Sequence, residues 1–206
     1  MPLQNRVLPT GEIVAAPTRG LFTGNRGILR FDGSALTARR WSHPHWICCT
    51  PAHPRGQYHG PQPTHGWTPL FFLDEAVALA AGHRPCGYCR PKAYAQFRKA
   101  WQLAHGPVAR VIAIDRALHA ARVTRDRRQI THQARLVALP DGSFIAHAGH
   151  SWLVLGDFLL RLSADGYDLR QPRSDALVTV LTPAPTIAIL SAGYQPALHP
   201  SATAPA

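Results

Sequence analysis

Four cysteines and a group of histidines are the residues of this chain whose types and spacing could do chemistry. Cys86 and Cys89 are separated by two residues in a turn that also contains proline and glycine. Such a turn lets the chain curl so that both sulfurs point at one metal ion. The only other cysteines, Cys48 and Cys49, are adjacent. The sequence therefore predicts a metal site, provided that the second pair reaches the same ion.

Cys49 and His53 can supply the second half of that site. Their thiolate and imidazole, joined by the thiolates of Cys86 and Cys89, form a tetrahedral set of three sulfurs and one nitrogen. Zinc fits this set because it accepts mixed ligands and keeps thiolates deprotonated. We expect Zn²⁺ as the cofactor, held by these four residues. The fourth ligand stays open, because other donors lie within a few residues of the sulfurs: His83, His45 and Cys48.

A second group of candidate catalytic residues consists of Asp115, His119 and His132. If the segment is helical, Asp115 and His119 share one face, so the carboxylate can orient the imidazole for base catalysis or metal binding. Arginines between the histidines could hold a phosphodiester. An alternative function is therefore a hydrolase or nuclease with a structural zinc. A salt-bridged or capping pair on a solvated helix explains the same spacing.

The charge balance predicts an anionic partner. The formal net charge is +11, and of the 22 basic residues only Lys92 and Lys99 are lysines. Arginine's planar fork binds phosphate bidentately, which favours nucleic acid over a membrane surface. Preference for arginine codons in a GC-rich genome explains the same composition. We expect DNA or another nucleic acid as the partner, and a non-catalytic nucleic-acid-binding module is a third possible function. The arginines expected to contact phosphates are Arg39, Arg40, Arg84 and Arg90.

The composition is that of a globular protein, with 46% hydrophobic and 16% charged residues. The sequence contains no apolar run long enough to cross a bilayer, and its start lacks the pattern of a signal peptide. We therefore expect a cytoplasmic protein. In that compartment thiols stay reduced, which favours metal binding or reactivity over disulfides for the four cysteines.

The elements that must position Cys86 and Cys89 are predicted on both sides of this pair. Residues 70–73 are apolar and indicate a buried strand. A helix follows from the acidic pair at 74–75 to 81, with Gly82 ending it. A second helix is predicted over 92–105, with aromatic residues recurring on one face. Residues 110–122 fit either a helix or a strand followed by a short helix.

The segment that carries the other cysteine pair is predicted to have little regular structure. Residues 39–67 are interrupted by proline and glycine and are poor in aliphatic side chains, so they need docking or a metal clip. Interleaved arginines and tryptophans there also suit a surface that binds phosphates and stacks on bases. Upstream, the sequence predicts a weak strand at 12–15, a loop at 23–27 and a strand at 28–31.

The second half of the chain is predicted to be rich in β-structure. A hairpin is expected from strands at 134–139 and 143–148 around the turn at 140–142. Further strands are expected at 151–155, 158–162 and 176–181, and a helix at 186–192. We therefore predict an α+β fold. A zinc-clipped α/β front half (1–105) packs on a small antiparallel β-rich back half (106–200) as one compact unit.

The run from Leu70 to Pro91, LFFLDEAVALAAGHRPCGYCRP, resembles the metal-binding domain at the N-terminus of the Ada DNA-repair protein. In that family an apolar strand and an EALAAG helix lead into an RPC turn with a second cysteine, a basic residue and a proline. The family's first ligand pair reads Cys-Arg-Pro-Ser-Cys. The segment from Cys49 to His53 is similar, with Pro51 matching and His53 in place of the second cysteine. The resemblance covers about residues 46–95.

This resemblance implies an activity as well as a metal. In the Ada family a zinc-bound thiolate accepts a methyl group from a methylphosphotriester in DNA. By position the acceptor would be Cys49, with Cys86 and Cys89 as further ligands. The resemblance therefore implies a DNA-interacting protein that takes part in alkylation repair.

Overall fold

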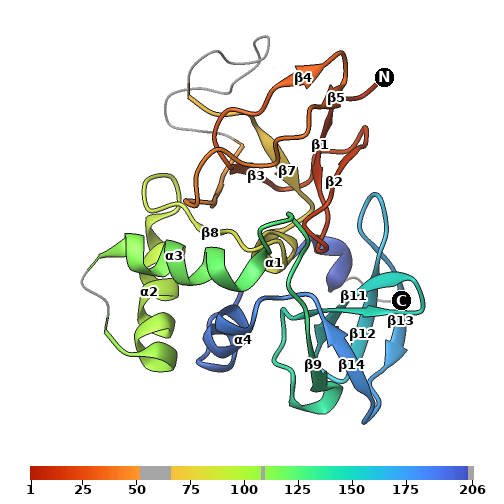
Figure 1. Cartoon of the computed structure of the whole chain (residues 1–206). Coiled ribbons are helices and arrows are strands. Elements are labelled where there is room, and N and C mark those ends of the chain that lie inside the picture. The colour runs from red at the N-terminus through yellow and green to blue at the C-terminus, as the bar shows by residue number, and fades with distance from the viewer. Residues whose placement is uncertain (52–65, 108–109, 204–206) are drawn as a thin grey trace.

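The computed structural model describes residues 1–51, 66–107 and 110–203. Within these residues, four α-helices and three β-sheets form a mixed α+β fold. Figure 1 places the first part of the chain in one sheet, the later part in another, and the helix α1 (Glu75–Ala80) between them. The predicted α+β class is therefore confirmed.

The first sheet contains both cysteine segments. It is mixed, because β1 runs parallel to β7 and β6 runs parallel to β8, while its other pairs are antiparallel. Its strands, in spatial order, are β2 (Ile13–Ala15), β1 (Gln4–Val7), β7 (Leu70–Phe72), β3 (Phe22–Asn25), β6 (Ile47–Cys49) and β8 (Arg84–Pro85). A separate two-stranded ribbon joins β4 (Phe31–Asp32) to β5 (Ala35–Leu36).

The second sheet is antiparallel throughout, as expected for the back half. Its strands, in spatial order, are β13 (Tyr167–Pro172), β12 (Phe158–Leu162), β11 (His150–Leu155), β10 (Phe144–His147), β14 (Leu177–Val180) and β9 (His132–Arg135). The predicted strands at 151–155, 158–162 and 176–181 are confirmed as β11, β12 and β14.

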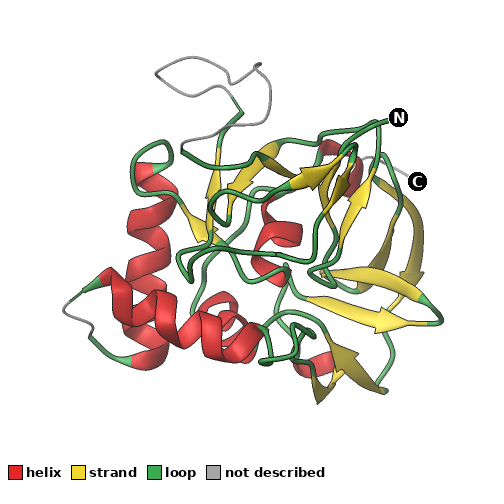
Figure 2. Cartoon of the chain, turned by 45° about the horizontal axis from the view of Figure 1, so that its top comes forward, coloured by secondary structure: helices red, strands yellow, loops and turns green. Residues whose placement is uncertain are grey.

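The helices confirm most of the helical predictions. The carboxylate of Asp74 caps α1 by accepting a hydrogen bond from the backbone N–H of Val77 at 3.0 Å. The helix α2 (Pro91–His105) matches the helix predicted after the cysteine turn, and α3 (Val111–Arg122) resolves the ambiguous segment as a helix. The helices α2, α3 and α4 (Ala184–Ser191) lie together at one side of the molecule (Figure 2). In the described part of the chain, no helix is long and apolar enough to cross a membrane.

The core joins the two halves of the chain. One cluster of buried side chains contains residues of β1, β7 and α1 together with Phe144, Leu153 and Leu160 of the second sheet. A second cluster packs Phe97 of α2 against Ile189 of α4. Elements from before and after residue 105 therefore share their cores, and burying both sets of apolar side chains stabilises the two halves together.

The hairpin predicted at 134–148 is wrong. The strand β9 pairs with β14, and β10 pairs with β14 and β11, so the segment between them crosses from one edge to the interior of the sheet. Leu136 and Leu139 are both buried. Their spacing of three suits the 3₁₀ turn at Leu136–Ala138 but not a strand, in which they would face opposite sides.

The loop predicted at 23–27 is also wrong in its first half. Residues 22–25 form β3, which lies between β7 and β6 in the sheet. A Cβ atom at Gly24 would come within 2.3 Å of the ring of Phe72. The glycine is there because the ring packs against the backbone, a requirement that single-sequence patterns do not distinguish from a turn. In the neighbouring segment 39–67, predicted to have little regular structure, the described residues 39–51 and 66–67 contain only the short strand β6.

Candidate metal centre

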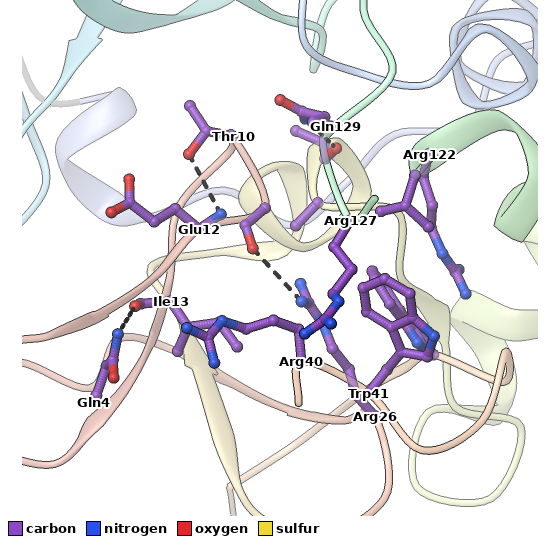
Figure 3. A pocket seen from close by; sticks show the side chains of 15 residues that line it. Gln4, Thr10, Glu12, Ile13, Arg26, Arg40, Trp41, Arg122, Arg127 and Gln129 are labelled. Atoms are coloured by element: carbon purple, nitrogen blue, oxygen red, sulfur yellow. Dashed lines mark hydrogen bonds between the residues drawn. The ribbon is translucent and has the colours of Figure 1, made fainter. Parts of the chain in front are cut away.

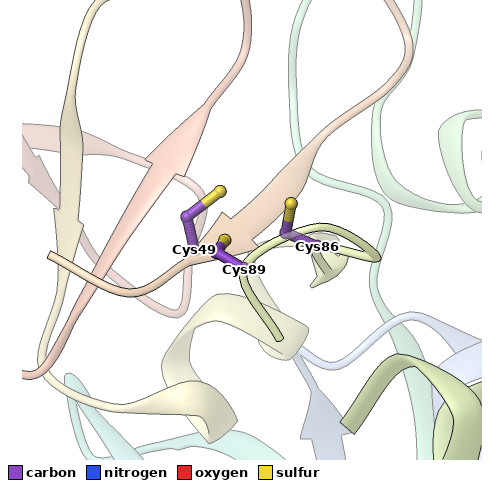
Figure 4. Close-up of side chains that lie close together, drawn as sticks. All are labelled: Cys49, Cys86 and Cys89. Carbon is purple, nitrogen blue, oxygen red and sulfur yellow. The ribbon is translucent and has the colours of Figure 1, made fainter. Parts of the chain in front are cut away.

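The structure brings together three of the four predicted metal ligands. The sulfurs of Cys49, Cys86 and Cys89 lie within 4.8 Å of one another (Figure 4). Cys49 ends β6, whereas Cys86 and Cys89 lie in the turn between β8 and α2. Three thiol groups at this separation can bind a single zinc ion, leaving one coordination position for a fourth ligand.

Backbone pairing explains why the two segments meet. In the parallel pair of β6 and β8, Cys48 lies opposite Pro85. The N–H of Cys86 donates to the carbonyl of Cys48 at 2.9 Å, and the N–H of Arg90 donates back to the carbonyl of Cys86 at 3.0 Å. The first bond fixes the turn to the strand and the second closes the turn. The cluster is therefore built on hydrogen-bonded backbone rather than on free loops.

The local electrostatics favour a thiolate in this turn. The thiol of Cys49 donates a hydrogen bond to the sulfur of Cys86, as do the backbone N–H groups of Cys89 and Tyr88, and these bonds lower the pKa of Cys86. The same side-chain bond, followed by burial, raises the pKa of Cys49. Burial raises the pKa of Cys89, although the N–H of Thr50 opposes it. These bonds therefore favour the thiolate form at Cys86, and a bound cation would stabilise thiolates at the other two positions.

Cys48 is excluded from the cluster by the geometry of a strand. Adjacent residues of β6 point to opposite faces of the sheet, so Cys48 faces away from Cys49. Its side chain is 1% exposed and belongs to the main core cluster. A guanidinium nitrogen of Arg90 lies 3.6 Å from its sulfur, yet burial still raises the pKa of the Cys48 thiol. Cys48 is a core residue and not the fourth ligand of this site.

The two described histidines that were candidates for the fourth ligand have other partners. The ring of His83 packs 4.7 Å from that of Phe72, and its Nε2 accepts a hydrogen bond from Arg26 at 3.2 Å. The Nδ1 of His45 lies 2.8 Å from a carboxylate oxygen of Asp115. Neither belongs to the sulfur cluster. His53 lies outside the described residues, so its role as the fourth ligand stays a prediction.

The expectation that Arg84 and Arg90 contact phosphates is wrong, because both side chains are bound to buried carboxylates. The guanidinium of Arg84 donates to both carboxylate oxygens of Asp115, at 2.6 and 3.0 Å. That of Arg90 donates to both oxygens of Glu75, at 2.8 and 2.7 Å. Each arginine side chain is only 8% exposed. These bidentate pairs position the cysteine turn from inside the protein. Sequence patterns do not identify these partners, which lie 15 and 31 residues away along the chain.

Arg39 and Arg40, the other two predicted phosphate contacts, lie in a surface depression that we call the basic groove. Trp41 lines the same groove. None of the described residues that line it is acidic. The residues that define the groove are Ala38, Arg39, Arg40, Trp41, Arg125 and Arg127. Four guanidinium groups around an indole ring form a surface with positive charge and a stacking face.

The alternative catalytic group is not assembled as predicted. Asp115 and His119 share α3, but the contacts of Asp115 are with Arg84 and His45. His119 accepts a hydrogen bond from Arg122 at 2.8 Å, and burial together with that cation lowers its pKa to about 4. His132 lies on β9, opposite Val180. The carboxylate therefore orients His45 in place of His119.

Comparison of the chain with protein-family models, with curated proteins and with solved structures found no match. The resemblance to the Ada metal-binding domain therefore rests on the residues that carry it. Those residues belong to the strand at 70–72, the helix at 75–80 and the cysteine turn.

Proposed function

We propose that this protein is a zinc-dependent nucleic-acid-binding protein, in which the zinc is structural. The observation that carries the metal is the close approach of three sulfurs from segments separated by more than 30 residues. Zn²⁺ bound there would neutralise thiolates and clip β6 to the turn before α2. Cys49, Cys86 and Cys89 would hold it, and His53 is proposed as the fourth ligand.

The proposed nucleic-acid surface is the basic groove. Its arginines come from two segments, residues 39–40 and 125–127, and a guanidinium of Arg127 donates to the carbonyl of Ala38 across them. This bond holds the two segments together, so the charges are positioned along one surface. Arginine side chains would contact phosphates, and Trp41 offers its ring to an unpaired base.

We expect Arg39→Gln and Arg125→Gln each to weaken nucleic-acid binding. Each phosphate contact that is lost should reduce the slope of log K against log salt by about 1. Fluorescence anisotropy with a labelled single-stranded oligonucleotide, measured at several salt concentrations, gives this slope. Arg98→Gln on α2, which removes the same charge from an exposed position outside the groove, is the matched control. Equal slopes in all four proteins would refute the proposed surface.

Methyl transfer to Cys49 is a second candidate function. One observation favours it: Cys49, the acceptor by resemblance, lies in the sulfur cluster. Its side chain is only 4% exposed, however, and Cys89 is the more accessible sulfur. An attacking thiolate must reach the methyl group in line, so a buried sulfur favours a structural metal over an acceptor.

Mass spectrometry after incubation with methylphosphotriester-containing DNA separates the two functions. We expect the peptide that contains Cys49 to keep its mass, because its sulfur is buried. A peptide that gains one methyl mass, in the wild type but not in Cys49→Ala, would make repair the function instead. Unmethylated DNA of the same sequence is the control.

A further inference from the structure

A second cavity lies beside the basic groove and is a different kind of site. It encloses about 290 Å³. Four arginines line it, Arg26, Arg40, Arg122 and Arg127, whereas Glu12 is the one acidic residue among the described residues around it. Figure 3 shows that these side chains come from different parts of the chain. Arg40, Trp41 and Arg127 line the groove as well, so the two hollows are neighbours that share part of their walls.

The deepest part of the cavity is formed by two arginines stacked on one tryptophan. The guanidinium carbon of Arg26 lies 3.9 Å from the ring centroid of Trp46, and that of Arg122 lies 3.7 Å from it. Both arginines are only 2% exposed. The stacking holds both planar groups in fixed orientations and lessens the cost of burying them.

Neither of these buried cations is paired with a carboxylate. Arg26 contacts His83, and Arg122 donates to the carbonyls of Gly82 and Pro44 at 2.6 and 2.7 Å. One terminal nitrogen of Arg26 and the Nε of Arg122 have no hydrogen-bond partner among the described residues. A buried cation without a counter-charge costs free energy. This contrasts with the buried pairs of the metal-centre region, in which every arginine has its own carboxylate.

Both groups keep their positive charge at neutral pH. Burial, followed by repulsion from Arg40, lowers the pKa of Arg26 to about 9. Burial and repulsion from Arg26 lower the pKa of Arg122 to about 8, and the attraction of Asp115 opposes this only in part. Both oxygens of Asp115 are bound by Arg84 and His45. The cavity thus presents two buried cations that an incoming anion could neutralise.

We propose that this cavity binds a phosphate monoester, with the phosphate against Arg26 and Arg122. A monoester carries up to two negative charges at neutral pH and three strong acceptor oxygens, which suit the unpartnered terminal nitrogen of Arg26 and the unpartnered Nε of Arg122. A phosphodiester carries a single negative charge, so it would neutralise only one of the two buried cations. Arg40, Trp41 and Arg127 also line the cavity, and Trp41 offers a stacking face to the rest of the ligand.

The volume of the cavity indicates how much of a ligand it can hold. It is at the small end of the range of ligand pockets, about 300 to 1,000 Å³, and leaves room for atoms of the ligand beyond its phosphate group. The phosphate could belong to a free mononucleotide or to the end of an oligonucleotide lying in the groove. Binding of an oligonucleotide end rests on the proposed function, whereas binding of a free mononucleotide does not.

Titration calorimetry with the zinc-loaded full chain tests the proposal. The probes are inorganic phosphate, adenosine 5′-monophosphate, and one short oligonucleotide with and without a 5′-phosphate. We expect the phosphate groups to bind. We expect Arg26→Met to weaken that binding by about tenfold or more, as the loss of a charge-assisted hydrogen bond predicts. Circular dichroism of the free variant checks that it folds.

A second variant keeps the test valid if Arg26→Met fails to fold. Arg127 is exposed, so Arg127→Gln leaves the buried stack intact and should still weaken binding of the monoesters, whereas Arg98→Gln should not. Binding of adenosine 5′-monophosphate alone supports the site even if no oligonucleotide binds, in which case the nucleic-acid function fails separately. Equal binding of the two oligonucleotides, with no binding of either small phosphate, overturns the proposal.

Discussion

Cys86→Ser and Cys89→Ser are each expected to reduce bound zinc from about one ion per chain to less than about a tenth of that, and to destabilise the fold strongly. The two sulfurs lie in one turn, and the third belongs to a strand in a different part of the sequence. A metal shared between them therefore adds a further link between segments that also meet through the backbone pairing of β6 with β8.

The size of the effect follows from what the ion contributes. Structural zinc binds with an apparent free energy of about 10 to 16 kcal/mol, and this energy is available only to the folded site. Losing a ligand should lower the free energy of unfolding by more than about 4 kcal/mol, within the range known for lost metal sites. Metal analysis by mass spectrometry and urea denaturation measure the two effects.

Cys48 provides a matched control for the cysteine substitutions. It is adjacent to Cys49 but faces the core, so Cys48→Ala should keep the full zinc content and lose about 1 to 2 kcal/mol through the small cavity it leaves. Zinc content that falls as much in Cys48→Ala as in Cys86→Ser would mean that the sulfur cluster is not the metal site. So would a purified wild-type protein with less than about a tenth of an ion per chain.

The part of the site that sequence could predict is the part encoded by local spacing. The spacing of Cys86 and Cys89 in a turn between two helices is enough to predict that their sulfurs lie close together. The proline and histidine that follow Cys49 are the signal that predicts it as a further ligand. The helices at 75–80 and 91–105 are likewise set by local signals, an acidic cap and aromatic periodicity. These features depend on contacts between residues a few positions apart.

The part that could not be predicted depends on partners far away along the chain. β13 alternates weakly because most of its side chains are exposed, so its sequence does not show that it pairs with β12. The sequence places Arg26 in a predicted loop and Arg122 among the arginines between His119 and His132, although both are stacked on Trp46. Charge alone does not reveal whether an arginine faces solvent, a carboxylate or an indole ring.

Glu75 is the clearest example of such a distant partnership, and Glu75→Gln is expected to cost about 3 to 5 kcal/mol of stability. From the sequence alone, Glu75 is expected only to complement the dipole at the N-terminus of α1. In the structure it is 1% exposed and accepts hydrogen bonds from Arg90, from the hydroxyl of Tyr194 at 2.6 Å and from the backbone N–H of Ala197 at 2.9 Å. Glutamine keeps the size but removes the charge, leaving the buried cation of Arg90 unpaired.

The control is Tyr194→Phe, which removes one neutral donor and leaves the ion pair. It should cost about 1 kcal/mol, the usual net value of one hydrogen bond. Chemical denaturation of the zinc-loaded proteins compares the two. If Glu75→Gln loses no more than Tyr194→Phe, the ion pair is not what stabilises this junction.

Glu75→Gln should also loosen the metal, which links this residue to the zinc site. Arg90 follows Cys89 directly, and its N–H closes the cysteine turn on the carbonyl of Cys86. The carboxylate of Glu75 thus fixes the turn through its ion pair with Arg90. Tyr194 and Ala197, in the back half of the chain, fix Glu75 through hydrogen bonds. A chelator should therefore remove zinc faster from Glu75→Gln than from wild type or Tyr194→Phe. Equal rates in the three proteins would show that the turn is held by the metal and its backbone bonds alone.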